Sequence, residues 1–306
     1  MNADDLRLAH IELRDRLLDA GLLIPTGVDG LYGRSALFEH VVRGVDDQIV
    51  ALGNEDDPEV VEFPPILPRA TFDHIGYMQS FPQLGGTVFS FLGGDREHMA
   101  MLQQIQDGAP YADALEQTDL ALTPACCYPV YPMATGRLPE AGRVFQMRNY
   151  IFRHEPSVDP MRMVAFRQRE HVCLGTPEQV LLWRERWFQR VPKLFAEIGI
   201  EVSTDIANDP FFGRGGRLMA AAQLEQELKF EFSVPVYGID HATACSSLNY
   251  HEEHFGELFD IEIADAHRAH SACIGFGVER CAVALFAKHG TNVDAWPGAV
   301  KSRLWS

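Results

Sequence analysis

The sequence predicts an α+β fold in which helices flank an antiparallel sheet. Residues 144–152 and 163–172 alternate apolar with polar side chains, and the turn-forming loop 155–160, which contains two prolines, separates them. This arrangement indicates a long hairpin. Strand patterns cluster without regular helical crossovers between them, which favours an antiparallel sheet over a doubly wound parallel sheet.

Two helical patterns precede the strand-rich middle of the chain. The first carries Leu6, Leu13, Leu17 and Leu18 on one stripe and stops at Gly21. A second apolar stripe runs over residues 37–52 and ends at Gly53. After it, residues 60–63 read as a short strand closed by prolines.

A third helix is predicted after the hairpin. Thr176 and Gln179 form a capping-box pattern with Pro177 at the first helical position. The apolar stripe then continues over 180–198, with a bend expected at Pro192.

The last third of the chain combines an insertion, a strand and a glycine-rich turn. Residues 211–228 read as a flexible, locally basic loop that runs into a helix, with Arg214 and Arg217 as its positive charges. Residues 228–234 alternate as a half-buried strand. The polar positions of that strand are Lys229, Glu231 and Ser233. Gly275-Phe276-Gly277 leads into an apolar helix.

Composition limits the class of protein. The 306 residues are 46% hydrophobic, enough for one large domain over 1–306, with a helical segment at 1–57 and the main body from about 58. The acidic start and the lack of an apolar run of ~18 residues predict a soluble, cytoplasmic protein. The six scattered cysteines favour thiols or metal ligands over disulfides. A net charge of −17 disfavours a polyanionic partner such as RNA.

Two short segments are candidates for a nucleotide site. Phe152-Arg153-His154-Glu155 places an arginine and a carboxylate two residues apart, on one face of a strand, although the tetrapeptide alone more often makes an exposed ion pair. Gly275 to Arg280 lacks both the third glycine of a dinucleotide fingerprint and the Gly-Lys-Ser/Thr of a P-loop. It therefore reads as a strand-to-helix turn that places Arg280 at the positive end of a helix, or as a simple packing turn.

Together these segments resemble motifs 2 and 3 of the class II aminoacyl-tRNA synthetases, Phe-Arg-x-Glu and Gly-x-Gly-x-x-Arg. Phe63-Pro64-Pro65-Ile66-Leu67 is similar to their degenerate motif 1. Within the class, three further strings resemble seryl-tRNA synthetases: Leu122 to Cys127, Phe166 to Glu170 and Ser246 to Asn249. The resemblance spans about residues 60–286.

Two departures narrow the resemblance. The long N-terminal coiled coil of seryl-tRNA synthetases is absent, and Cys127 stands where they have a glutamate in the amino-acid pocket. Both features, and the string from Cys127 to Pro132, resemble the amino acid:carrier-protein ligases, which are similar to the archaeal zinc-dependent seryl enzymes.

The resemblance implies a zinc ion held by Cys127, Glu170 and Cys273, with an open position for the amino group of the substrate. Cys126 is an alternative ligand. Without the resemblance, isolated cysteines are more often small buried apolar residues. Three cysteines are assigned to packing: Cys173, Cys245 and Cys281.

The resemblance also implies an ATP site. Arg153 is expected on the α-phosphate, Arg280 on the γ-phosphate, Glu155 at the adenine amino group and Phe166 against the ring, with Arg162 as a further contact. Magnesium (Mg²⁺) normally assists, but Thr243 and Ala244 stand where seryl enzymes carry a magnesium-binding glutamate. The substrate contacts expected are Ser247 and Asn249.

One metal-like motif is rejected. His251-Glu252-Glu253-His254 spaces its histidines three apart, whereas the zinc-peptidase motif needs four to bring both onto one helical face. We expect a loop with ordinary polar roles, in which His251 remains a possible substrate contact.

The resulting hypothesis is an enzyme that forms an aminoacyl adenylate from glycine or alanine and passes it to the phosphopantetheine thiol of a carrier protein. A homodimer is expected from motif 1, and Arg214 with Arg217 are the candidate carrier-docking surface. The alternatives are a minimal tRNA-charging enzyme and a non-catalytic paralogue. The net charge disfavours the first, and the presence of Arg153 and Arg280 disfavours the second.

Overall fold

A seven-stranded sheet forms the centre of the computed structural model, which describes residues 1–305 apart from the side chain of Arg214. The strands are, in spatial order, β10 (Ser203–Ile206), β11 (Lys229–Val234), β12 (Thr243–Glu252), β14 (His270–Gly277), β9 (Ala165–Gly175), β8 (Arg143–Phe152) and β3 (Glu59–Val61). Neighbours are antiparallel except for β3 and β8, which run parallel at one edge. The predicted hairpin and antiparallel sheet are confirmed, and the parallel edge strand is an addition.

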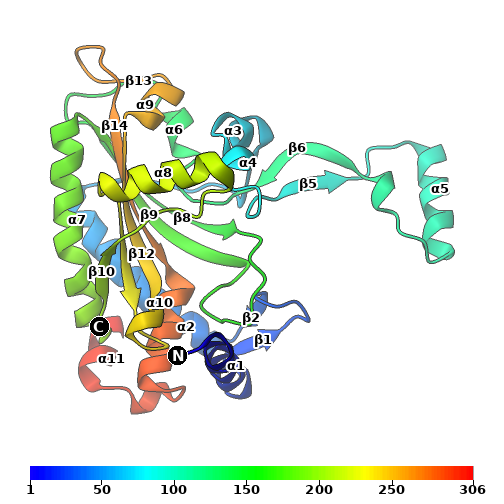
Figure 1. Cartoon of the computed structure of the whole chain (residues 1–306), viewed down its shortest axis with the longest axis horizontal. Coiled ribbons are helices and arrows are strands. Elements are labelled where there is room, and N and C mark those ends of the chain that lie inside the picture. Colours follow the sequence, from blue (N-terminus) through cyan, green and yellow to red (C-terminus); the bar gives the residue numbers. More distant parts are fainter. Residues whose placement is uncertain (306) are drawn as a thin grey trace.

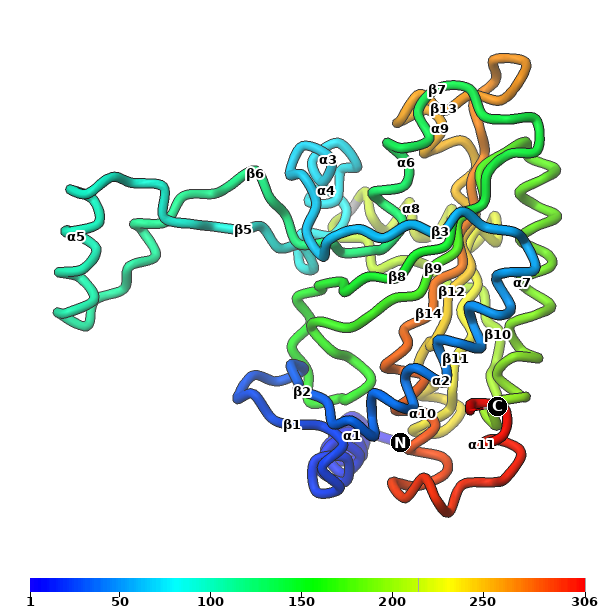
Figure 2. The backbone as a smooth tube through the Cα atoms, turned by 180° about the vertical axis from the view of Figure 1, so that it is seen from behind, coloured from blue at the N-terminus to red at the C-terminus, as the bar shows by residue number. Residues whose placement is uncertain are grey.

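Three helices cover one face of this sheet (Figures 1 and 2): α2 (Ala36–Gly53), α7 (Pro177–Glu197) and α10 (Val278–His289). The Thr176 hydroxyl accepts from the Gln179 amide, so the predicted capping box begins α7. Trp187 of α7 packs against His171 and Phe276 of the sheet. The contact between α2 and the sheet is so close that a Cβ on Gly53 would lie 2.0 Å from the His171 ring. The hydrophobic core therefore lies between this face and its helices.

The opposite face of the sheet carries α8 (Gly213–Glu225), which crosses in front of the strands in Figure 1. The predicted basic loop thus becomes helical two residues after it begins, and Arg217 belongs to this helix. Gly216 is the one buried residue of α8 among those whose side chains are described. The helix therefore covers a space and contributes little to the core.

An arm projects from the body of the molecule (Figures 1 and 2). It consists of β5 (Thr87–Ser90), α5 (Asp95–Gln106) and most of β6 (Glu116–Leu122), which continues a three-stranded sheet with β4 (Ile66–Pro68). No residue of this projecting arm, 87–120, is buried.

The remaining elements surround these parts. They are α1 (Ala3–Asp19), β1 (Leu23–Pro25), β2 (Tyr32–Arg34), α3 (Arg69–His74), α4 (Tyr77–Ser80), α6 (Val130–Met133), β7 (Gly136–Arg137), α9 (His254–Leu258), β13 (Ile261–Glu262), α11 (Gly298–Trp305) and 3-10 turns at Asn54–Asp56, Ala112–Ala114, Ile239–His241 and Val293–Ala295. Within residues 1–305, none of the helices has both the length and the apolar character that crossing a bilayer requires.

Candidate active site

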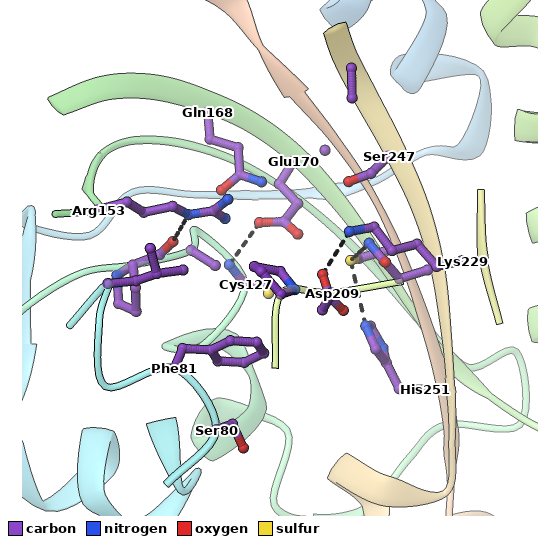
Figure 3. Close-up of a pocket in the computed structure, with 18 of the residues that line it drawn as sticks. Ser80, Phe81, Cys127, Arg153, Gln168, Glu170, Asp209, Lys229, Ser247 and His251 are labelled. Atoms are coloured by element: carbon purple, nitrogen blue, oxygen red, sulfur yellow. Dashed lines mark hydrogen bonds and ion pairs between the residues drawn. The ribbon is translucent and has the colours of Figure 1, made fainter. Parts of the chain in front are cut away.

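A cavity of about 530 Å³ lies between the sheet and α8 (Figure 3). Strand alternation decides which side chains reach it, because successive side chains of a strand point to opposite faces. On β9, Phe166, Gln168 and Glu170 line the cavity. Arg167 and Arg169 point the other way and pair with acidic residues of the helices behind the sheet.

Two arginines and an aromatic ring form one end of the cavity. The guanidinium carbons of Arg153 and Arg280 lie 6.0 Å and 5.5 Å from the centre of the Phe166 ring. Neither arginine forms an ion pair with an acidic side chain of residues 1–305; their nitrogens donate to the carbonyls of Pro124, Met161 and Ala244. The cross-strand ion-pair interpretation of Arg153 is therefore wrong, and the two cations are held by neutral carbonyls beside a buried aromatic ring.

The arginine end of the cavity is electrostatically costly without an anion. Burial, and then the positive charges of Arg153 and Arg162, lower the pKa of Arg280. An arginine nevertheless stays charged in a protein. Desolvated, mutually repelling guanidinium groups of this kind suit a polyanion such as a triphosphate, which arginine binds through charge-assisted hydrogen bonds.

The structure corrects the expectation that Arg153 and Glu155 lie on one face of a strand. Strand β8 ends at Phe152, so both residues lie just beyond it and not on one strand face. Both still line the cavity. Arg162 has an exposed side chain outside the cavity lining.

Cys127, Glu170 and Cys273 meet in the same cavity. One ligand atom from each lies within 4.8 Å of the other two, and all three residues are buried. The amide of Cys127 donates to the Glu170 carboxylate at 3.0 Å, which fixes that carboxylate in place (Figure 3). The predicted group is therefore brought together from three separate segments of the chain.

The ionisation of this group indicates what it can bind. Burial raises the pKa of the Glu170 carboxyl. A hydrogen bond with Cys273 lowers the pKa of Cys127, but burial and the Glu170 charge outweigh it and raise that pKa to about 11. The hydrogen bond with Cys127, and then burial, raise the pKa of Cys273. A divalent cation compensates such groups on ionisation, and two thiolates with one carboxylate are a donor set that fits zinc.

The predicted substrate residues lie beside this group. Ser247 and Asn249 line the cavity from β12, and the Asn249 amide nitrogen is 3.6 Å from Cys273 Sγ. His251 also lies in the cavity, with Nε2 at 3.6 Å from the same sulfur. The predicted loop at 251–254 is wrong: His251 belongs to the end of β12 and His254 begins α9.

Comparison with known proteins identifies the family to which this chain belongs. Two proteins of Bradyrhizobium diazoefficiens, amino acid–[acyl-carrier-protein] ligases 1 and 2, are 41% and 42% identical to this chain over 292 residues. Each alignment covers 95% of this chain and 89% or 87% of the relative. The chain belongs to the amino acid–[acyl-carrier-protein] ligase family.

More distant relatives of this ligase family member confirm the class II resemblance. A type-2 serine–tRNA ligase of Methanopyrus kandleri is 25% identical over 206 residues, 63% of this chain and 39% of the relative. The M. kandleri seryl-tRNA synthetase solved with A. aeolicus tRNASec has a TM-score of 0.80 at 19% identity, over 95% of this chain and 60% of that one. A Cryptosporidium parvum prolyl-tRNA synthetase has a TM-score of 0.65 at 12% identity, over 91% and 52%. A scan against protein-family models finds no match.

The structure distinguishes the two adjacent cysteines of this ligase. The Cys126 thiol points at the backbone oxygen of Gln168, at 3.1 Å, and stays outside the three-residue group. Cys127 is therefore the better placed ligand. Cys173 and Cys281 are buried outside the cavity lining, whereas Cys245, expected only to pack, lines the cavity.

Sequence reasoning missed a polar cluster on the α8 side of the cavity. Lys229 is buried, 2.6 Å from Asp209 and 3.0 Å from Glu231, and Asp209 also exchanges hydrogen bonds with Gln223 of α8 (Figure 3). Although burial lowers the pKa of Lys229, these carboxylates outweigh that effect and raise it. Lys229 was predicted only as a polar position of a half-buried strand, because alternation marks a polar face without showing whether a cavity or water lies beyond it.

Three other positions named in the sequence analysis remain to be placed. Ala244 lines the cavity and offers no carboxylate for magnesium; its carbonyl accepts from Arg280 instead. Arg217 is exposed on the outer side of the site, and the Arg214 side chain lies outside what the structure describes.

Proposed function

We propose that this protein activates glycine or alanine with ATP and transfers the aminoacyl group to the phosphopantetheine thiol of a carrier protein. One observation carries the proposal: Arg153 and Arg280, which pair with no acidic side chain among the described residues, share a cavity with the Cys127, Glu170 and Cys273 group. The cavity thus offers an anion end and an amine end within one space. The names of the Bradyrhizobium relatives support the reaction class.

In the proposed reaction, a carboxylate oxygen of the amino acid attacks the α-phosphorus of ATP, and pyrophosphate leaves. Arg153 stabilises charge on the α-phosphate and Arg280 on the γ-phosphate. Phe166 stacks on the adenine ring, and the Glu155 carboxylate accepts a hydrogen bond from the adenine amino group. Catalysis then consists mainly of positioning and charge stabilisation. Zinc, when bound by Cys127, Glu170 and Cys273, supplies a Lewis acid that holds the amino group of the substrate in its neutral form.

The other residues orient the substrate. Ser247 and Asn249 supply polar contacts at the amine end, and Mg²⁺ accompanies the triphosphate. The buried side chains of Cys127, Glu170 and Cys273 bound the amine end of the cavity, and glycine and alanine are proposed as substrates from the family resemblance.

The direct test is exchange of labelled pyrophosphate into ATP with each of the twenty amino acids. We expect exchange with glycine or alanine well above that with large amino acids. A non-catalytic paralogue gives no exchange with any of them. A tRNA-charging enzyme gives exchange and loads tRNA but not a phosphopantetheinylated carrier.

The carrier is proposed to dock near the N-terminal end of α8. Carrier proteins are usually acidic and this chain has a net charge of −17, so docking needs a local positive surface. Arg214 and Arg217 are the candidates. Changing both to Glu should leave pyrophosphate exchange unchanged and slow transfer to the carrier thiol, and added salt should slow transfer by the wild type as well. Equal transfer rates for variant and wild type would remove this surface from the proposal.

A homodimer is the proposed assembly, and the projecting arm supports it. Residues 87–120 hold no buried residue, yet they carry exposed apolar side chains that a single copy leaves in water. These are Phe89, Leu92, Met99, Ile105, Tyr111 and Leu120. The arm is also acidic, with six carboxylates and Arg96 as its lone arginine or lysine, which disfavours an acidic carrier as its cover.

Light scattering should therefore give twice the chain mass of 34.3 kDa at micromolar concentration. Replacing residues 91–115 by a short Gly-Ser linker should raise the dimer dissociation constant by about tenfold or more, because apolar burial is lost. A monomer mass for the wild-type protein contradicts the assembly.

A further inference from the structure

We propose that Asn249 and His251 are positioning residues for Cys273: each donates an N–H to its sulfur and so sets the donor strength of that metal ligand. The inference rests on the proposed metal site and goes beyond it, because it concerns residues that do not ligate. Asn249 Nδ2 and His251 Nε2 both lie 3.6 Å from Cys273 Sγ, a distance suited to the larger radius of sulfur.

The backbone explains why two donors reach one sulfur. Asn249 of β12 pairs directly with Cys273 of β14, so the two side chains emerge side by side on the cavity face. The register then shifts between Tyr250 and Glu252, which leaves His251 as the extra residue of a β-bulge. Bulges near functional sites re-aim a side chain, and here the bulge lets His251 approach Cys273 as well.

The hydrogen-bond chain determines which nitrogen of His251 carries the proton when Cys273 is a thiolate. His251 Nδ1 lies 3.1 Å from the hydroxyl of Ser271, which is fully buried. A thiolate only accepts, so Nε2 must hold the proton, and Nδ1 then accepts from the Ser271 hydroxyl. The result is a relay from Ser271 through His251 to the sulfur.

His251 is a supporting residue and not a fourth ligand in this geometry. The atoms that lie mutually within 4.8 Å come from Cys127, Glu170 and Cys273, and His251 is outside that set. Its ring is held by edge-to-face contact with Phe255, at 4.9 Å between ring centres. Figure 3 shows His251 reaching the group from the opposite side to Arg153.

The negative charge of the ligands determines how these hydrogen bonds affect the proposed metal ion. Two thiolates and a carboxylate place three negative charges on one divalent ion. N–H donors on a thiolate withdraw electron density from it, which leaves the ion a stronger Lewis acid toward the substrate amine. Outer-shell partners of this kind typically contribute about 10- to 100-fold in metal affinity.

The test replaces zinc by Co²⁺ in the full-length protein and records the thiolate-to-cobalt charge-transfer bands. His251→Phe keeps an aromatic ring and removes both nitrogens. Its bands should move to longer wavelength, because a thiolate without the N–H donor gives up its electron more easily, and chelator competition should show about tenfold weaker Zn²⁺ binding. Asn249→Leu should shift the bands in the same direction, and His251→Gln should restore them in part.

His254→Phe is the matched control, since His254 also lines the cavity beside Phe255 but has no contact with Cys273. Its spectrum should match that of the wild type. Unshifted bands and unchanged Zn²⁺ affinity in both His251→Phe and Asn249→Leu would overturn the inference while leaving the metal site standing. A wild-type protein that binds neither Co²⁺ nor Zn²⁺ would overturn the metal site and this inference together, whereas the ATP end would still be tested by pyrophosphate exchange.

Discussion

Arg153→Ala and Arg280→Ala should each lower amino-acid-dependent pyrophosphate exchange by about 10³-fold or more. Each change removes a proposed charge-assisted contact to a phosphate in a partly buried cavity, where a preorganised donor commonly contributes 10²- to 10³-fold and a charged one more. The effect should lie in adenylate formation itself, measured with saturating amino acid and ATP. Lysine at either position should recover part of the rate, because it keeps the positive charge. Recovery should stay incomplete, because lysine cannot form the bidentate hydrogen bonds of a guanidinium group.

The control for these variants is Arg148→Ala on the same hairpin. Arg148 pairs with Asp46 behind the sheet, and Asp46 keeps its second partner, Arg169. Exchange by this variant should stay within a few-fold of the wild type. Thermal unfolding should confirm that Arg280→Ala is folded, since the change leaves the carbonyls of Met161 and Ala244 without a donor. Near-normal exchange in both active-site variants would remove ATP activation from the proposed function.

Cys273→Ser should lose both the bound metal and the activity. Untreated wild-type protein should hold about one zinc per chain, as a three-ligand catalytic site does, and the serine variant far less, because a hydroxyl does not ionise to replace a thiolate. Metal content by plasma emission and pyrophosphate exchange should fall together. Chelation of the wild type should have the same effect, reversed by added Zn²⁺.

Cys281→Ser is the matched control for metal loss. Cys281 is as buried as Cys273 but lies in α10, outside the cavity lining. It should keep its zinc and its activity, with only a change in stability. Absence of metal from untreated wild-type protein, together with activity that survives chelation, would reduce Cys127, Glu170 and Cys273 to core residues.

The long elements were predictable because their signals are local. The capping box at Thr176, the glycine that ends α2 and the turn between β8 and β9 each depend on neighbouring residues. The meeting of Cys127, Glu170 and Cys273 depends on residues far apart in the chain. Spacing alone cannot show such a convergence, and only the resemblance to a family suggested it.

The misses have physical causes as well. The role of Lys229 was missed because an alternating strand looks the same when its polar face lines a cavity. The loop predicted for residues 251–254 was wrong because the spacing of two histidines does not show that His251 lies in the bulge of a strand. No prediction was made for the arm, since the apolar side chains of α5 do not show by their spacing whether they are covered, and none of its residues is buried in a single copy.

Helix α8 has a further consequence for how fast the protein works. Its first turns contain Gly213, Gly215 and Gly216, its N-cap residue Phe212 makes no side-chain capping hydrogen bond, and Glu225 stands at its negative end. Its ends are therefore intrinsically weak, although residues 218–224 are good helix formers. It is held chiefly at its two ends, by the pairing of Phe211 with Phe81 and by the hydrogen bonds between Asp209 and Gln223. A segment so weakly held unfolds locally at a small free-energy cost compared with the sheet beneath it.

The same helix stands over the cavity in which the adenylate is expected to form. While it is in place, we expect it to keep water from the proposed mixed anhydride, which water would otherwise hydrolyse. When it detaches, we expect the acceptor thiol to gain entry and the spent nucleotide to leave. We therefore expect the rate of the catalytic cycle to be set by the marginal stability of these thirteen residues and not by formation of the mixed anhydride.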